Sequence, residues 1–192
     1  MLFAIVQTVY WLALSSWFGG VVFVAVSAPL IFRAVREYNP ILPTVLSVNL
    51  EGQHATLLAG TIVATLVKML VRVELGCAGV ILLASIGQGF ILDLSETSER
   101  AAFLVRGALF ILAVALTIYD WRVLWPRIWK SRQEYLDHAD EPDVANPARE
   151  RFNQHQQQSV TLMSIMLFLL LGMILFSALI APPGHHELFP SH

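Results

Sequence analysis

The residues best suited to chemistry in this sequence are a few polar side chains within otherwise apolar stretches. Arg106 lies one to two turns into one apolar run, and Gln88 lies in the run before it. A charged side chain at the centre of a bilayer costs about 2.5–3.5 kcal/mol, so such residues are functional candidates. Arg106 could bind an anion or pair with another helix, and the alternative is that it snorkels to the headgroups. Gln88 could line the same polar site or join two helices by hydrogen bonding.

A second group of polar residues lies where apolar runs end. Two histidines in this group could in principle ligate a metal ion or haem iron. No HExxH or CxxC spacing accompanies them, so we expect no metal and no cofactor. The alternative is a polar network that holds the helix ends together. The group comprises Asp120, Arg122, His54 and the pair Arg151 and His155, which are four residues apart and share a helix face.

The composition indicates that the chain needs lipid as its solvent. Of its 192 residues, 56% are hydrophobic and 14% are charged, whereas a soluble domain is about 45–50% apolar and about 25% charged. These proportions argue against a nucleic-acid-binding module, a disordered tail or an ordinary soluble enzyme. Cys77 is the only cysteine, so no disulfide forms within the chain. The sequence has no nucleophile elbow, Walker loop or dinucleotide fingerprint, which favours a protein that is not an enzyme.

Four apolar stretches are long enough to cross a bilayer, which requires about 20 residues. We therefore predict an all-α integral membrane protein, a four-transmembrane-helix bundle in a single domain over residues 1–184. The four predicted spans cover about 9–32, 75–92, 101–119 and 159–181.

The segments between the spans are less apolar. The apolar run 55–67 is too short to span alone, and we predict a short interfacial helix around 55–72. One alternative is that this run extends the second span, and another is that 55–74 forms a fifth crossing. Residues 130–158 are predicted to form a solvated loop, and 185–192 a tail that could bind a metal weakly through its histidines.

The basic residues predict the orientation of the spans. The loop between the first two spans has four, and the loop between the last two has six, which leaves two of the twelve for the other side. The positive-inside rule then places both long loops in the cytoplasm and both termini on the non-cytoplasmic side. Aromatic residues near the span ends are typical of an interfacial belt, although Trp121, Trp125 and Trp129 could also stack on a flat ligand.

Three stretches together resemble a known family. They are 12–32, which contains Trp17 and the motif APLIF, then the AGTIV motif at 59–63, and WPRI at 125–128 followed by RFxxHxxxS at 151–159. In this order they resemble the transmembrane protein 205-like family, also catalogued as domain of unknown function 4149, over nearly the whole chain. The resemblance implies a four-helix integral membrane domain, and it assigns no activity, substrate or cofactor. The matching positions are Gly19, Gly20, Pro29, Phe32, Gly60, Pro126, Arg127, Phe152, His155 and Ser159.

Three functions follow from these patterns. The favoured one is a small solute or ion binding or transport module that uses Arg106 and Gln88. The second is a structural or scaffolding membrane subunit. The third is a haem- or metal-dependent redox protein that uses His54 and His155, although the first span has no histidine. We expect the lipid bilayer as the partner, no nucleic acid, and a homo-oligomer if the protein transports, because four helices make a thin wall for a pore.

Overall fold

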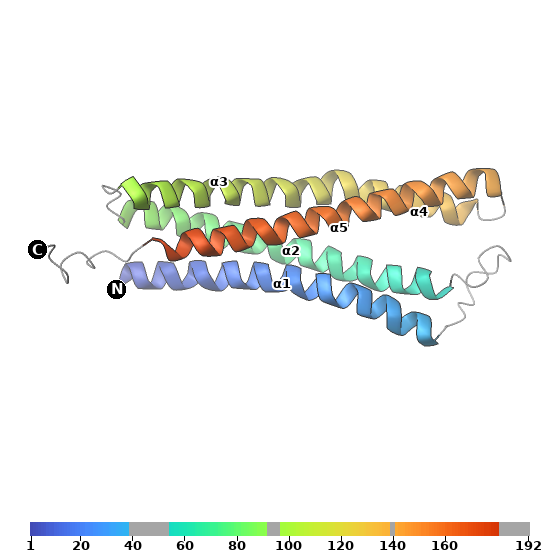
Figure 1. The fold of residues 1–192 in the computed structure, drawn as a ribbon, viewed down its shortest axis with the longest axis horizontal. Helices are drawn as coiled ribbons and strands as arrows, with labels where there is room; N and C mark the ends of the chain where they lie inside the picture. Colours follow the sequence, from blue (N-terminus) through green and yellow to red (C-terminus); the bar gives the residue numbers. More distant parts are fainter. Residues whose placement is uncertain (39–53, 92–96, 139–140, 181–192) are drawn as a thin grey trace, which may run out of the picture.

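The apolar stretches of the sequence form long helices. The computed structural model describes residues 1–38, 54–91, 97–138 and 141–180, and this part of the chain is almost entirely helical and has no strand (Figure 1). After α3, the chain continues through the five-residue π-helix η2 into α4 without leaving the helical path. The elements are α1 (Leu2–Tyr38), α2 (His54–Ile91), α3 (Thr97–Tyr119), η2 (Asp120–Leu124), α4 (Trp125–Asp137) and α5 (Pro142–Ala178).

Four helical stretches are long and apolar enough to cross a membrane. They contain 34–38 residues each, so at about 1.5 Å per residue they extend well beyond a hydrocarbon core of about 30 Å. Large apolar side chains also cover the outside of the bundle, such as Phe90, which is 87% exposed, and Phe168, which is 74% exposed. Such surface is unfavourable in water, and the structure is compatible with a multi-pass membrane protein. The stretches are Leu2–Tyr38, Leu58–Ile91, Arg100–Asp137 and Asp143–Ala178.

The short interfacial helix predicted around 55–72 is not a separate element. These residues form the first half of α2, which is continuous over 38 residues. The helix continues because Lys68 and Arg72 lie on an exposed face while Leu70 and Val71 remain buried, so the charges do not interrupt the packed face. The alternative that this run extends the second span therefore describes the structure, and a separate fifth crossing would require a chain reversal that α2 does not contain.

The prediction of a solvated loop over 130–158 is wrong, because most of this segment is helical. It forms the end of α4 and the beginning of α5, and Pro142 is placed at the first turn of α5, where a missing N–H costs nothing. A small core of Tyr135, Ala145 and Ala148 holds the two helices together. The hydrophilic composition of this segment reflects the exposed faces of paired helices rather than an irregular loop.

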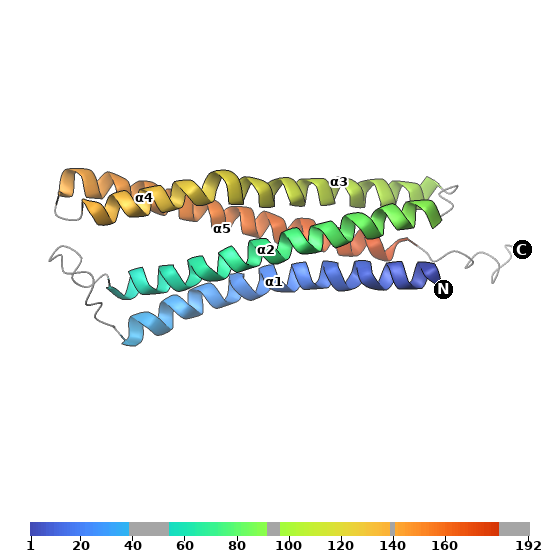
Figure 2. The same cartoon turned by 180° about the vertical axis from the view of Figure 1, so that it is seen from behind.

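The helices pack as two pairs that share one core. α1 packs against α2, α5 packs against α3 and α4, and the two pairs diverge toward the end where α1 finishes and α2 begins (Figures 1 and 2). The middle of the bundle is apolar and closely packed. Most of the buried polar side chains form two separate clusters along the bundle, one on each side of this apolar layer, whereas Ser131 lies apart on α4. The layer includes Leu14, Ile81, Ala113, Leu170 and Met173, all of them fully or almost fully buried.

The beginning of α1 and the end of α5 lie at the same end of the bundle (Figure 1), and the side of the membrane that this end faces is a prediction from the basic residues. In a Cys77→Ala background, we expect a membrane-impermeant thiol reagent to label Arg100→Cys and not Arg36→Cys on intact cells. Both native side chains are exposed, so accessibility reports sidedness. The Cys77→Ala protein alone should remain unlabelled, and the opposite labelling pattern would reverse the proposed orientation.

Candidate functional site

The first polar cluster surrounds Arg106, and we call it the arginine cluster. The Arg106 side chain is only 2% exposed, and its Nη2 donates a hydrogen bond of 2.7 Å to Oε1 of Gln88. Nε2 of Gln88 donates in turn to Oε1 of Gln7 at 2.6 Å. The guanidinium lies over the rings of Tyr10 and Phe103, at 4.6 and 4.8 Å from their centroids, as in cation–π contacts. Arg106 therefore lies inside the bundle, and the snorkelling alternative does not apply.

The arginine cluster also reaches α5. The Ser177 hydroxyl donates to the carbonyl oxygen of Met173 at 2.6 Å, so the Tyr10 hydroxyl is the donor in its 2.9 Å hydrogen bond with Oγ of Ser177. Within the described residues, no carboxylate pairs with Arg106, and its buried Nη1 has no hydrogen-bond partner. The cluster thus joins α1, α2, α3 and α5 around one buried positive charge.

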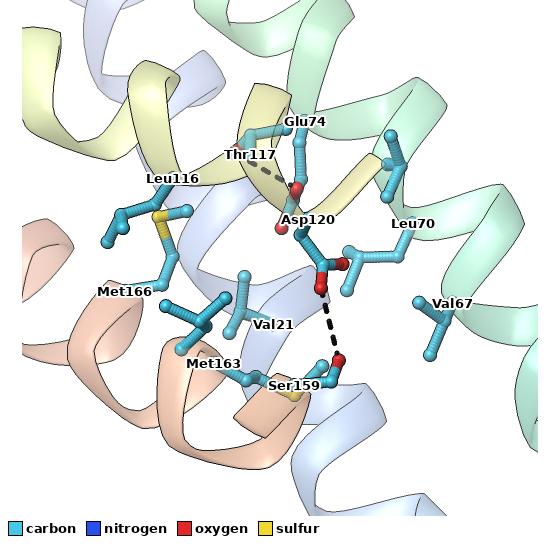
Figure 3. A pocket seen from close by; sticks show the side chains of 12 residues that line it. Val21, Val67, Leu70, Glu74, Leu116, Thr117, Asp120, Ser159, Met163 and Met166 are labelled. Atoms are coloured by element: carbon cyan, nitrogen blue, oxygen red, sulfur yellow. Dashed lines mark hydrogen bonds between the residues drawn. The ribbon is translucent and has the colours of Figure 1, made fainter. Parts of the chain in front are cut away.

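The second polar cluster lies on the other side of the apolar layer, and we call it the acidic cluster. Glu74 of α2, Thr117 of α3, Asp120 of η2 and Ser159 of α5 border one cavity of about 30 Å³. Oγ1 of Thr117 donates to Oε2 of Glu74 at 3.2 Å, and Oγ of Ser159 donates to Oδ1 of Asp120 at 3.2 Å. Figure 3 shows the two carboxylates directed toward the same space, which apolar side chains such as Val21 enclose.

Local sequence explains how each acidic side chain reaches the cavity. Glu74 is four residues from Leu70 and from Ala78, so it shares their buried helix face and is only 6% exposed. Thr117 and Asp120 are three residues apart and therefore neighbours on one face of the helix. The π-helix begins at Asp120, whose carbonyl accepts the N–H five residues later. Such π-helical turns occur frequently at functional sites.

The acidic cluster has no counter-charge within the described part of the chain. Neither Glu74 nor Asp120 forms an ion pair there, and the two carboxylates are close enough to repel each other. The nearest basic residues along the same helices do not neutralise the two carboxylates, because Arg72 is exposed and the Arg122 guanidinium stacks over the Trp121 ring at 4.7 Å. Removing a carboxylate from water without compensation costs several kcal/mol, so a bound cation or proton would stabilise this arrangement.

The indole of Trp17 adds a buried donor beside this cluster. Trp17 is 0% exposed, and its N–H lies next to the Glu74 carboxylate. This N–H nevertheless has no hydrogen-bond partner in the described part of the chain. A buried donor without a partner is costly, and a water molecule with suitable polar neighbours commonly satisfies it.

The remaining predicted site residues lie apart from both clusters. His155 contacts Ser131 across the α4–α5 pair, with 3.5 Å between Nδ1 and Oγ, and Arg151 forms an ion pair of 3.0 Å with Glu134. His54 is the first residue of α2, and its side chain lies outside the described residues, as do the tail histidines. Among the described side chains, no group of three or more metal-ligating residues occurs.

The positions of the family resemblance are spread along the bundle. Of these, Ser159 lies in the acidic cluster, and Gly20 faces Leu70, whose Cδ1 would lie 2.9 Å from an added Cβ. Gly19 and Gly60 face open space. The others lie on α1 (Pro29 and Phe32), on α4 (Pro126 and Arg127) and on α5 (Phe152 and His155).

Two residues of the acidic cluster, Glu74 and Thr117, are not among the site residues predicted from the sequence. Glu74 follows Lys68 and Arg72 at the edge of an apolar run, so its charge alone does not distinguish a buried residue from a helix boundary. Its four-residue spacing from Leu70 and Ala78 is the signal that could have identified it as buried. Comparison of the sequence with protein-family models gives no match, and neither the curated proteins nor the solved structures contain a significant match.

Proposed function

We propose that this protein binds a small cation within the membrane and transports it, and that the acidic cluster is the binding site. The observation that supports this proposal is that Glu74 and Asp120, from different helical segments, border one cavity without a basic partner in the described residues. Ionisable residues within a membrane bundle usually mark ion pathways or proton relays. The proposal replaces Arg106 and Gln88 with the carboxylates as the ligand-binding residues.

The chemistry of the cavity fits a hard cation. Its polar lining consists of two carboxylates and the hydroxyls of Thr117 and Ser159, and hard cations prefer such oxygen ligands. Both hydroxyls donate their hydrogen to a carboxylate, which leaves their oxygen lone pairs free to face an ion. A cavity of about 30 Å³ has room for an ion together with a water molecule, since each water requires about 10–15 Å³.

The arginine cluster and the apolar layer separate this cavity from the end of the bundle where α1 begins. A cation that crosses the bundle would have to pass the packed layer around Leu14 and Ile81 and then the buried charge of Arg106. Transport therefore requires these layers to separate, and we propose that the transporting form is a homo-oligomer that supports such a movement. Membership of the transmembrane protein 205-like family remains a prediction from the sequence motifs.

Uptake of radiolabelled Na⁺ into proteoliposomes tests the proposal. The wild-type protein is expected to give saturable uptake above that of empty liposomes, and Glu74→Gln is expected to reduce it at least about tenfold because a charged ligand is lost. Glu134→Gln is the matched control, since it changes a carboxylate on the α4–α5 pair outside the cavity. Equal uptake by the wild-type protein and Glu74→Gln, or no uptake above empty liposomes, contradicts the proposal and favours a structural membrane subunit.

A further inference from the structure

We propose that the acidic cluster exchanges a small alkali cation, of the size of Na⁺ or Li⁺, for a proton on the same pair of carboxyl groups. This inference rests on the proposed function, because it names the second ligand of the same site. It follows from three features of the described residues: the one cavity that Glu74 and Asp120 both border, the absence of a basic partner, and the buried indole N–H of Trp17 beside Glu74.

The two carboxyl groups of the acidic cluster share one buried cavity. Two carboxylates that share a poorly solvated site do not both ionise readily, because burial disfavours the charged form of each and their mutual repulsion is only weakly screened there. Glu74 is 6% exposed, and it lies close enough to Asp120 for this repulsion to act. Without a bound cation, at least one of the two carboxyl groups should therefore retain a proton.

The groups that surround the two carboxyl groups determine whether a proton is needed, because a nearby basic group would balance their charge instead. α1 contributes Trp17 and Val21, and α5 contributes Ser159 and methionine side chains, none of which is charged. The titratable neighbour on α2 is the Cys77 thiol, one turn from Glu74, and it supplies no positive charge. Only a proton or an incoming cation can therefore balance the carboxylates within this part of the chain.

A bound cation favours the ionised state of Glu74. When Glu74 is ionised, its carboxylate can accept the N–H of Trp17, either directly or through a water molecule in the cavity. This N–H is fully buried and unpartnered in the described structure, so it is positioned to stabilise the ionised form. The indole therefore stabilises the ionised form of Glu74 more than the protonated form, because a hydrogen bond to a charged acceptor is the stronger one.

The exchange is balanced and involves no redox chemistry. The O–H bond of a carboxylic acid breaks, the proton leaves to water, and the cation takes up contacts with the carboxylate oxygens and the hydroxyls. For a monovalent cation, the charge of the site does not change. Cation and proton therefore compete for one site, which is the thermodynamic basis of antiport, because each ligand lowers the affinity of the other by the same factor.

Proton release on cation binding is the direct test. Purified full-length protein in weakly buffered detergent solution should release about one proton per Na⁺ bound when NaCl is added, and none when choline chloride is added at equal ionic strength. The apparent affinity for Na⁺ should rise by up to about tenfold for each pH unit in the range where the proton is retained.

The outcomes separate this inference from the proposed function. Na⁺ binding without proton release, and with an affinity independent of pH, overturns the exchange and leaves cation binding intact. An absence of Na⁺ binding overturns both. Ser159→Ala keeps both carboxyl groups and should still release a proton with a weaker affinity, whereas the Glu74→Gln, Asp120→Asn double variant should release none.

Discussion

Glu74→Gln weakens the binding of Na⁺ by about 100-fold in this account, which is the largest functional effect that we expect from a single substitution. The glutamine keeps the shape of the side chain and the oxygen that can accept the Thr117 hydroxyl, but it has no charge. Loss of one charged partner at a desolvated site typically costs 2–5 kcal/mol, and about 2.8 kcal/mol corresponds to 100-fold.

The measurement is the melting temperature of the detergent-solubilised protein as a function of NaCl, with choline chloride added to keep the ionic strength constant. A ligand that binds the folded protein raises the melting temperature as its concentration exceeds the dissociation constant. The wild-type protein and Glu134→Gln should show this rise, and Glu74→Gln should not show it over the same range. Ser159→Ala should need only about tenfold more NaCl for the same rise in melting temperature, because it removes a neutral ligand. Identical curves for Glu74→Gln and the wild-type protein would show that Glu74 does not bind the cation.

Gln88→Leu lowers the free energy of unfolding by about 3 kcal/mol, which is the largest effect on stability that we expect. The substitution removes the hydrogen bond that Arg106 makes with α2 and leaves a guanidinium buried without any hydrogen bond among the described residues. Leaving a buried group without its hydrogen bond typically costs about 1–3 kcal/mol, and more when the group is charged. Gln7→Leu removes the outer member of the same chain and should cost only about 1 kcal/mol.

A double-mutant cycle measures this interaction. Unfolding by sodium dodecyl sulfate in mixed micelles should show that Arg106→Leu combined with Gln88→Leu recovers part of the stability lost in Gln88→Leu, because the unpaired charge is gone. The Na⁺-dependent rise in melting temperature should survive in Gln7→Leu, since the arginine cluster and the acidic cluster lie on opposite sides of the apolar layer. A loss below about 0.5 kcal/mol in Gln88→Leu, within the range of ordinary surface substitutions, would mean that Arg106 is not held by Gln88.

The sequence predicted the membrane-spanning helices because long apolar runs without charge have few other interpretations. It also singled out Arg106 and Gln88 as candidate functional residues, because polar side chains are rare within apolar runs. The hydrogen bond between them was not predictable, because it depends on the rotation and axial position of two helices. Such relations come from packing of the whole bundle, and only a structure provides them.

Glu74 and the segment 130–158 show where composition misleads. A charged residue at the edge of an apolar run is typical of the end of a membrane span. Glu74 instead lies on the buried face of its helix together with Leu70. A polar segment resembles a loop, although a few small apolar residues such as Ala145 and Ala148 hold it as a helical pair. In both cases the position of a residue on its helix face decides the outcome, and the average polarity of the segment does not.

The two clusters divide the buried polar residues by role. The arginine cluster connects four helices through direct hydrogen bonds and ring contacts, so its substitutions should act mainly on stability. The acidic cluster borders a cavity and has no basic partner among the described residues, so its substitutions should act mainly on ligand binding. We therefore expect Gln7→Leu to lower the free energy of unfolding and to leave Na⁺ binding unchanged, whereas Glu74→Gln should weaken Na⁺ binding.

Equilibrium binding of radiolabelled Na⁺ to the purified protein tests the central claim most directly. The wild-type protein is expected to bind about one Na⁺ per chain in a saturable manner, and the Glu74→Gln, Asp120→Asn double variant is expected to bind none while it retains the helical circular dichroism of the wild-type protein. Saturable binding that is equal in the double variant, or an absence of saturable binding in the wild-type protein, would contradict the assignment of the acidic cluster as a cation site.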